Sequence, residues 1–145
     1  MAFWDASAVV PLCFHQPATG ALGRLIQKHG RLVVWWGTPV EVRGAFSRLV
    51  REAVITEGGH QLALARLALL RRTWAEVTPT EKVRSLAEVL PGQYGIRAAD
   101  SFQLAAAMVW CKERPRRRPF VCFDQRLTDA AERVGFAVIT RAARS

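Results

Sequence analysis

Short apolar runs alternate along the chain with longer segments in which apolar residues recur at helical spacing. Five of the runs have the length and composition of strands: Ala2–Trp4, Leu32–Trp36, Glu76–Thr78, Phe120–Phe123 and Phe136–Thr140. Short, mostly apolar strands separated by helices are typical of a parallel sheet that is covered on both faces. The pattern therefore predicts an α/β fold, with residues 1–145 forming a single domain.

Five segments have helical periodicity. The first follows Thr38 and Pro39, which we interpret as the N-cap and the first helical residue. The other four cover residues 60–75, 81–90, 98–112 and 127–134. Thr80 is expected to cap the helix over 81–90, and Pro91 with Gly92 is expected to end it. Gly135 is expected to end the last helix.

Two of the predicted strands stop on an aspartate. Asp5 follows the first strand and Asp124 follows the strand over 120–123, although the chain has only four Asp in all. In a parallel sheet the carboxyl ends of the strands share one edge, where ligand sites form. If these two strands are neighbours, the two carboxylates face each other there. An Asp after a strand can also make a turn or cap the next helix, so this second interpretation stays open.

Two further acids are candidates for the same site. Asp100 lies in the first turn of the apolar helix over 98–112, where the helix dipole and Arg97 make an acid tolerable without requiring one. Glu41 fits equally well as a site residue and as half of a capping box, in which its side chain reaches back to the Thr38 amide. Asp129 and Glu132, on the last helix, are expected to face solvent.

A cluster of these carboxylates requires a counter-charge. Two carboxylates about 5 Å apart at an effective dielectric of about 20 repel by roughly 3 kcal/mol, so several together would become protonated unless a cation neutralises them. Oxygen ligands without His or Cys select a hard ion such as Mg²⁺ or Mn²⁺. The histidines (His15, His29, His60) and cysteines (Cys13, Cys111, Cys122) have no zinc-binding spacing, and the odd cysteine count fits a reducing, cytoplasmic compartment.

The chain is strongly basic, with a net charge of +9 from 21 Lys and Arg against 12 Asp and Glu. This favours a polyanion such as RNA or DNA, or an acidic protein, as a partner, although codon composition alone also explains an excess of arginine. One concentrated run, residues 112–119, contains Arg114, Arg116, Arg117 and Arg118. These arginines could contact RNA phosphates, and a solvated loop is an equal alternative. The longest apolar run, residues 104–111, is too short to cross a membrane.

Four stretches resemble, in order and spacing, the acidic motifs of PIN-domain ribonucleases, above all the VapC-like toxins of bacterial type II toxin–antitoxin modules. They are MAFWDASAVV, TPVEVRGAF, IRAADSFQLAAA and FVCFDQRLTDAAERVGF. The resemblance implies a PIN-like three-layer fold, with a central parallel sheet of about five strands flanked by helices. It also implies that Asp5, Glu41, Asp100 and Asp124 are catalytic and bind Mg²⁺ or Mn²⁺, with Ser7 in support. Cys122 and Gln103 depart from the family, which often has Thr or Ser, and His, at these positions.

The same resemblance implies a metal-dependent endoribonuclease that hydrolyses RNA phosphodiesters with a metal-activated water. A toxin of this kind would have a cognate antitoxin and would form a homodimer. Two alternatives remain: a catalytically inactive PIN-fold module that binds RNA or protein, and a DNA-directed nuclease of the same fold.

Overall fold

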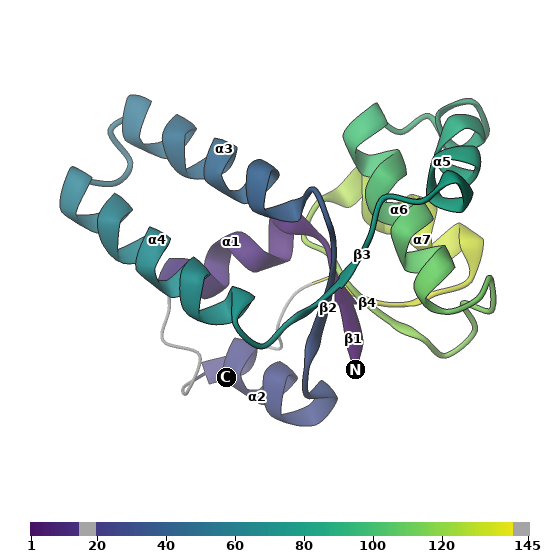
Figure 1. Ribbon diagram of the computed structural model, residues 1–145, viewed down its shortest axis with the longest axis horizontal. Coiled ribbons are helices and arrows are strands. Elements are labelled where there is room, and N and C mark those ends of the chain that lie inside the picture. Colours follow the sequence, from purple (N-terminus) through teal and green to yellow (C-terminus); the bar gives the residue numbers. More distant parts are fainter. Residues whose placement is uncertain (15–19, 141–145) are drawn as a thin grey trace.

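Five short strands form the central sheet in the computed structural model, which describes residues 1–14 and 20–140 (Figure 1). They are β1 (Ala2–Trp4), β2 (Leu32–Trp35), β3 (Ala75–Val77), β4 (Pro119–Val121) and β5 (Ala137–Ile139). Their order is β3-β2-β1-β4-β5, and every neighbouring pair is parallel. All five predicted strands are confirmed, with ends that differ by no more than two residues. His15 lies outside the described residues.

The described residues also form seven helices, arranged on both faces of the sheet. They are α1 (Ala6–Phe14), α2 (Gly20–His29), α3 (Thr38–Arg51), α4 (Glu57–Arg71), α5 (Glu81–Tyr94), α6 (Ala98–Trp110) and α7 (Gln125–Val134). In Figure 1, α1, α3 and α4 lie on one side of the strands and α5, α6 and α7 on the other. None of the helices in this part of the chain has the length and apolar content needed to cross a membrane.

The two faces of the sheet bury separate cores. Phe3 packs on one face with Val33, Phe120 and residues of α5, α6 and α7. Trp4 packs on the other face with Val34 and residues of α1, α3 and α4. Phe3 and Trp4 are both fully buried, which explains why β1 has no polar residue until the chain leaves the sheet at Asp5.

The start of α3 differs from the prediction. Gly37, not Thr38, is the N-cap, and its carbonyl oxygen accepts hydrogen bonds from the backbone N–H groups of Val40 and Glu41. Thr38 is fully buried, and its Oγ1 accepts a hydrogen bond from Gln103 Nε2 on α6. The predicted capping box between Thr38 and Glu41 is therefore wrong, because a contact with a distant helix engages both side chains.

The end of α5 and both ends of α4 also differ from the prediction. Thr80 caps α5 as predicted, with its Oγ1 accepting from the Val83 N–H at 3.3 Å. However, α5 does not break at Pro91 and continues to Tyr94, where Gly95 takes a left-handed conformation with φ of 66°. Proline removes one backbone donor from this last turn, and its own carbonyl still accepts from the Gly95 N–H. α4 begins and ends earlier than predicted, with Thr56 as its N-cap.

Candidate active site

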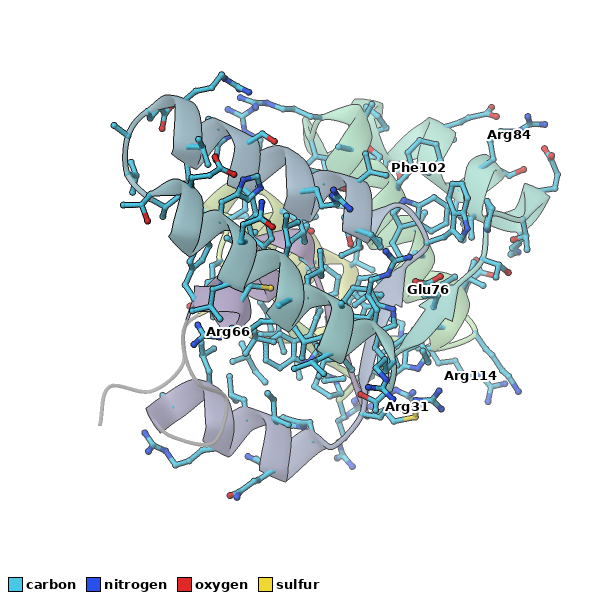
Figure 2. The ribbon with its side chains drawn as sticks, turned by 60° about the vertical axis from the view of Figure 1, so that its left-hand side comes forward. Arg31, Arg66, Glu76, Arg84, Phe102 and Arg114 are labelled. Carbon is cyan, nitrogen blue, oxygen red and sulfur yellow. The ribbon has the colours of Figure 1, made fainter. Side chains whose placement is uncertain are left out.

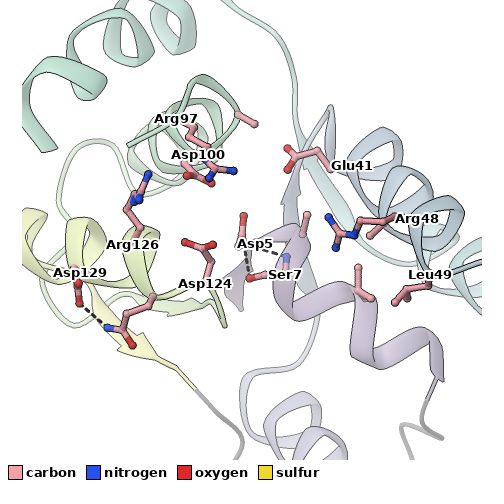
Figure 3. Close-up of a pocket in the computed structure, with 15 residues that line it drawn as sticks. Asp5, Ser7, Glu41, Arg48, Leu49, Arg97, Asp100, Asp124, Arg126 and Asp129 are labelled. Atoms are coloured by element: carbon pink, nitrogen blue, oxygen red, sulfur yellow. Dashed lines mark hydrogen bonds between the residues drawn. The ribbon is translucent and has the colours of Figure 1, made fainter. Parts of the chain in front are cut away.

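A polar pocket of about 920 Å³ opens at the carboxyl edge of the sheet (Figure 3). All four acids singled out in the sequence line it. Asp5 directly follows β1 and Asp124 lies between β4 and α7, while Glu41 comes from α3 and Asp100 from the first turn of α6. The pairing of β1 with β4 brings Asp5 and Asp124 to neighbouring strand ends. Four separate segments of the chain therefore direct carboxylates into one pocket.

Asp5 is the most deeply buried of the four, with only 4% of its surface exposed. Its backbone N–H extends the sheet by donating to the Val121 carbonyl at 2.9 Å. Its carboxylate Oδ2 accepts hydrogen bonds from the N–H of Ser7 at 3.0 Å and from Ser7 Oγ at 2.5 Å. Burial raises the pKa of Asp5, the two bonds from Ser7 oppose that rise, and the nearby charge of Asp100 adds to it.

Ser7 connects the ends of β1 and β4. Its hydroxyl donates to Asp5 and accepts a hydrogen bond from the Phe123 N–H at 2.9 Å. The Cys122 thiol lies 3.7 Å from both Ser7 Oγ and Asp5 Oδ2. Burial, reinforced by the charge of Asp5, raises the pKa of Cys122 to about 12, so the thiol stays neutral near pH 7. Ser7 thus holds the Asp5 carboxylate in one orientation.

Asp124 has a structural role and a position in the pocket at the same time. It is the N-cap of α7, and its Oδ1 accepts a hydrogen bond from the Leu127 N–H at 2.9 Å. The alternative interpretation of Asp124 as a helix cap is therefore confirmed. The cap uses one carboxylate oxygen, Oδ1. The other, Oδ2, has no hydrogen bond within the described part of the chain, and Asp124 lines the pocket.

Glu41 and Asp100 complete the group. Glu41 Oε1 accepts a hydrogen bond from Gln103 Nε2 at 3.0 Å. Burial raises the pKa of Glu41 to about 7, the bond from Gln103 lowers it, and the charges of Asp5 and Asp100 raise it further. Burial also raises the pKa of Asp100, followed by the charge of Asp124, while Arg97 and Arg126 lower it. The four carboxylates are therefore coupled electrostatically.

The donor types in this pocket suit a hard divalent cation. All four acids offer oxygen ligands, and the burial of Asp5, Glu41 and Asp100 together with the repulsion among the carboxylates gives a cation a favourable place to bind. Within residues 1–14 and 20–140, however, no three Asp, Glu, His or Cys side chains are already arranged to hold a metal ion. The residues fit Mg²⁺ or Mn²⁺ by chemistry, and the ligand geometry is not preformed.

Three arginines at the pocket were not predicted from the sequence as site residues, although Arg97 was considered as an ion-pair partner of Asp100. Arg48, Arg97 and Arg126 all line it, and Figure 3 shows them around the acids. Sequence spacing offered a signal for each of them. Arg48 lies seven residues after Glu41, on the same face of a helix, and the other two lie within three residues of Asp100 or Asp124.

The basic run lies elsewhere. Arg114, Arg116, Arg117 and Arg118 are exposed and belong to the loop between α6 and β4. This loop leads into β4 and is therefore at the amino edge of the parallel sheet, opposite the acidic pocket. The Arg118 guanidinium lies over the Trp110 ring, 4.3 Å from its centroid. The run is therefore not part of the pocket that contains the acids.

The raised pKa values of the pocket acids predict how the stability of the metal-free protein depends on pH. Glu41 ionises near 4.5 in the unfolded chain and near 7 in the folded protein, so between these values the folded state holds a proton that the unfolded state has lost. The free energy of unfolding should therefore fall as pH rises from about 4.5 to about 7. Asp5 and Asp100 act in the same direction. Urea denaturation in EDTA at several pH values measures the slope, which Glu41→Gln should reduce. If the free energy of unfolding of Glu41→Gln depended on pH as steeply as that of the wild type, the pKa of Glu41 would not be raised.

Together, the sheet order and the flanking helices define an α/β protein of PIN-like fold, and the predicted fold class is confirmed. The crystal structure of FitAcB from Neisseria gonorrhoeae is similar over 96% of this chain and 96% of that chain, with a TM-score of 0.62. The sequence identity is 16%, so the similarity demonstrates a shared fold. No family model and no curated protein sequence matches the chain.

Proposed function

We propose that the protein is a metal-dependent endoribonuclease that uses Asp5, Glu41, Asp100 and Asp124. The observation that carries this proposal is the convergence of the four carboxylates in one pocket, with burial and mutual repulsion raising the pKa of three of them. Buried acids without a cation are costly, and three arginines beside them favour an anionic substrate.

The residues in and around the pocket have different roles in the proposed mechanism. The four carboxylates would hold Mg²⁺ or Mn²⁺, and the ion, when bound, would lower the pKa of a water and polarise a phosphoryl oxygen. Ser7 keeps the Asp5 carboxylate in place, and the helix cap does the same for Asp124. Gln103 orients Glu41 from α6. Arg48, Arg97 and Arg126 attract and align the phosphate backbone.

Digestion of labelled nucleic acids tests the proposal. Single-stranded RNA should be cut internally in Mn²⁺, giving products with 5′-phosphate ends, and excess EDTA should abolish the cleavage. Cleavage that persists undiminished in EDTA would contradict metal dependence. Structured RNA and single-stranded DNA belong in the same experiment. A preference for DNA would favour the DNA-directed nuclease, and RNA binding without cleavage in Mn²⁺ would favour the inactive binding module.

We also propose that this nuclease is the toxin of a toxin–antitoxin pair, with a cognate antitoxin and a homodimeric state. The motif resemblance and the fold shared with FitAcB support this role. Growth arrest on expression, relieved by co-expression of the gene next to it, tests the toxin role. Light scattering at micromolar concentrations tests the homodimer.

The four exposed arginines of the basic run are proposed to contact the RNA backbone away from the scissile bond. Their place at the amino edge of the sheet means that they act on a part of the RNA that lies outside the acidic pocket. Replacing them with glutamine should flatten the salt dependence of RNA binding without moving the cleavage position.

A further inference from the structure

A second pocket, of about 480 Å³, lies beside α5 and α6, and three aromatic residues, Trp35, Trp36 and Phe102, are among those that line it. Trp35, the last residue of β2, stacks on Phe102 with ring centroids 5.4 Å apart and an interplanar angle of 6°. Trp36 stands edge-on to Trp35 and is 54% exposed. Figure 2 shows Phe102 and Arg84, which both line this pocket, at the same corner of the molecule. We name this the aromatic pocket.

The aromatic pocket opens at the same sheet edge as the four acids. Trp36 follows the carboxyl end of β2, and its backbone N–H donates to the Val77 carbonyl at the end of β3. On α6, Phe102 lines the aromatic pocket, and Asp100, two residues earlier, lines the acidic one. Between them Gln103 bonds to both Thr38 and Glu41. The two pockets are therefore neighbours, because α6 contributes a residue to each and Gly37, the N-cap of α3, lines the aromatic pocket while Glu41 of α3 lines the acidic one.

The floor of the aromatic pocket has an unused hydrogen-bond donor. Trp35 Nε1 forms no hydrogen bond within residues 1–14 and 20–140. This nitrogen is also not fully buried, so a ligand can reach it. Gly37 lies against it, and a Cβ at position 37 would come within 2.6 Å of that nitrogen. The backbone of Gly37, with φ of −80°, is one that any residue can adopt. Glycine is therefore needed here for space, and it leaves the indole N–H uncovered.

We propose that the aromatic pocket binds an unpaired base of the RNA, stacked on Trp36 and within reach of the Trp35 N–H. The inference rests on the proposed RNA substrate. Trp36 supplies an exposed aromatic ring beside the acidic pocket, and single-stranded RNA recognition uses such rings because every base has a face that stacks. The net charge of +9 favours a nucleic acid over an apolar peptide, and the volume is in the range of small-ligand sites.

Binding of a short single-stranded RNA in EDTA tests this without cleavage. By fluorescence anisotropy, Trp36→Ala should weaken binding roughly 5- to 150-fold, the effect of losing one stacked base, and Trp36→Phe should restore most of it. Leu69→Ala is the matched control, since Leu69 is an apolar residue on α4 that is exposed to a similar degree (61%), and this variant should bind RNA like the wild type.

An abasic scan of the RNA makes the test specific to a base. Removing one particular base should weaken binding to the wild type and have little further effect on Trp36→Ala. Three results would overturn the proposal. Trp36→Ala could bind RNA as tightly as the wild type, the loss of the base could weaken binding equally in both proteins, or the wild type could fail to bind RNA. If Trp36→Ala instead changes the oligomeric mass and leaves RNA affinity intact, the pocket holds a protein side chain.

The outcome also separates this inference from the proposed activity. RNA that is cleaved in Mn²⁺ with no dependence on Trp36 would overturn the base pocket alone. RNA that binds through Trp36 and is never cleaved would overturn the endoribonuclease alone.

Discussion

Asp124→Asn should abolish RNA cleavage while the protein stays folded. Asparagine keeps the side-chain oxygen that accepts from the Leu127 N–H, and it caps helices as well as aspartate does. The substitution removes one negative charge from the pocket, so stability in EDTA should be equal to that of the wild type or higher. Because even residues that only support metal ligands contribute about 10- to 100-fold, loss of a ligand should reduce the cleavage rate by at least about 100-fold.

Metal-induced stabilisation separates a metal ligand from a purely structural acid. The wild type should gain about 2.7 kcal/mol when Mn²⁺ is at a hundredfold excess over its dissociation constant. Asp124→Asn and Asp5→Asn should each lose most of this gain, which thermal melts with Mn²⁺ and with EDTA will measure. Asp129→Asn is the matched control, since Asp129 lies at the same pocket and its Oδ1 accepts from Gln125 Nε2 at 2.7 Å. A metal-induced shift that survives in both site variants would show that neither acid binds the ion.

Ser7→Ala should reduce both stability and cleavage. It removes the hydroxyl that donates to Asp5 and leaves the Phe123 N–H without its acceptor, which costs about 1 to 3 kcal/mol. Without that hydrogen bond the pKa of Asp5 should rise further, since the bond opposes the effect of burial. Cleavage should fall about 10- to 100-fold, and activity should be recovered more at high pH than at low pH.

Two other serine variants control for this effect. Ser7→Thr keeps the hydroxyl and should restore most of the activity. Ser101→Ala removes a nearly fully buried hydroxyl whose only hydrogen bond in the described structure is to the Arg97 carbonyl, close to its own helix. It should change stability modestly and leave the pH profile of cleavage in place. If Ser7→Ala and Ser101→Ala had the same pH profile, Ser7 would be no more than a structural residue.

Local patterns were sufficient to predict the sheet and the acids. The three central strands, β1, β2 and β4, are short apolar runs buried between two layers, so their composition alone marks them, and the edge strands β3 and β5 are only partly buried. Thr80 caps a helix through a contact three residues away, which a sequence motif can specify. Asp5 and Asp124 could be paired because parallel strands end at one edge, and the neighbouring positions of β1 and β4 then bring them together.

Features that depend on contacts between distant segments were not predictable in the same way. α1 was missed because its residues are apolar with little periodicity, and Pro11 lies within it. The capping box at Thr38 was wrong because Gln103, 65 residues away, binds both of its members. The aromatic pocket depends on how β2, α5 and α6 lie against one another, which no local spacing reveals.

The hydrogen bond between Ser7 and Phe123 has a consequence for synthesis of the protein. It joins residues 116 positions apart, and the pairing of β1 with β4 spans a similar length of chain. Proteins fold on the ribosome from the N-terminus as the chain emerges, so a nascent chain that ends before β4 has Asp5 but not Asp124. The acidic pocket cannot form until the chain has been translated through Asp124, so a translation product that is interrupted before Asp124 has no complete site.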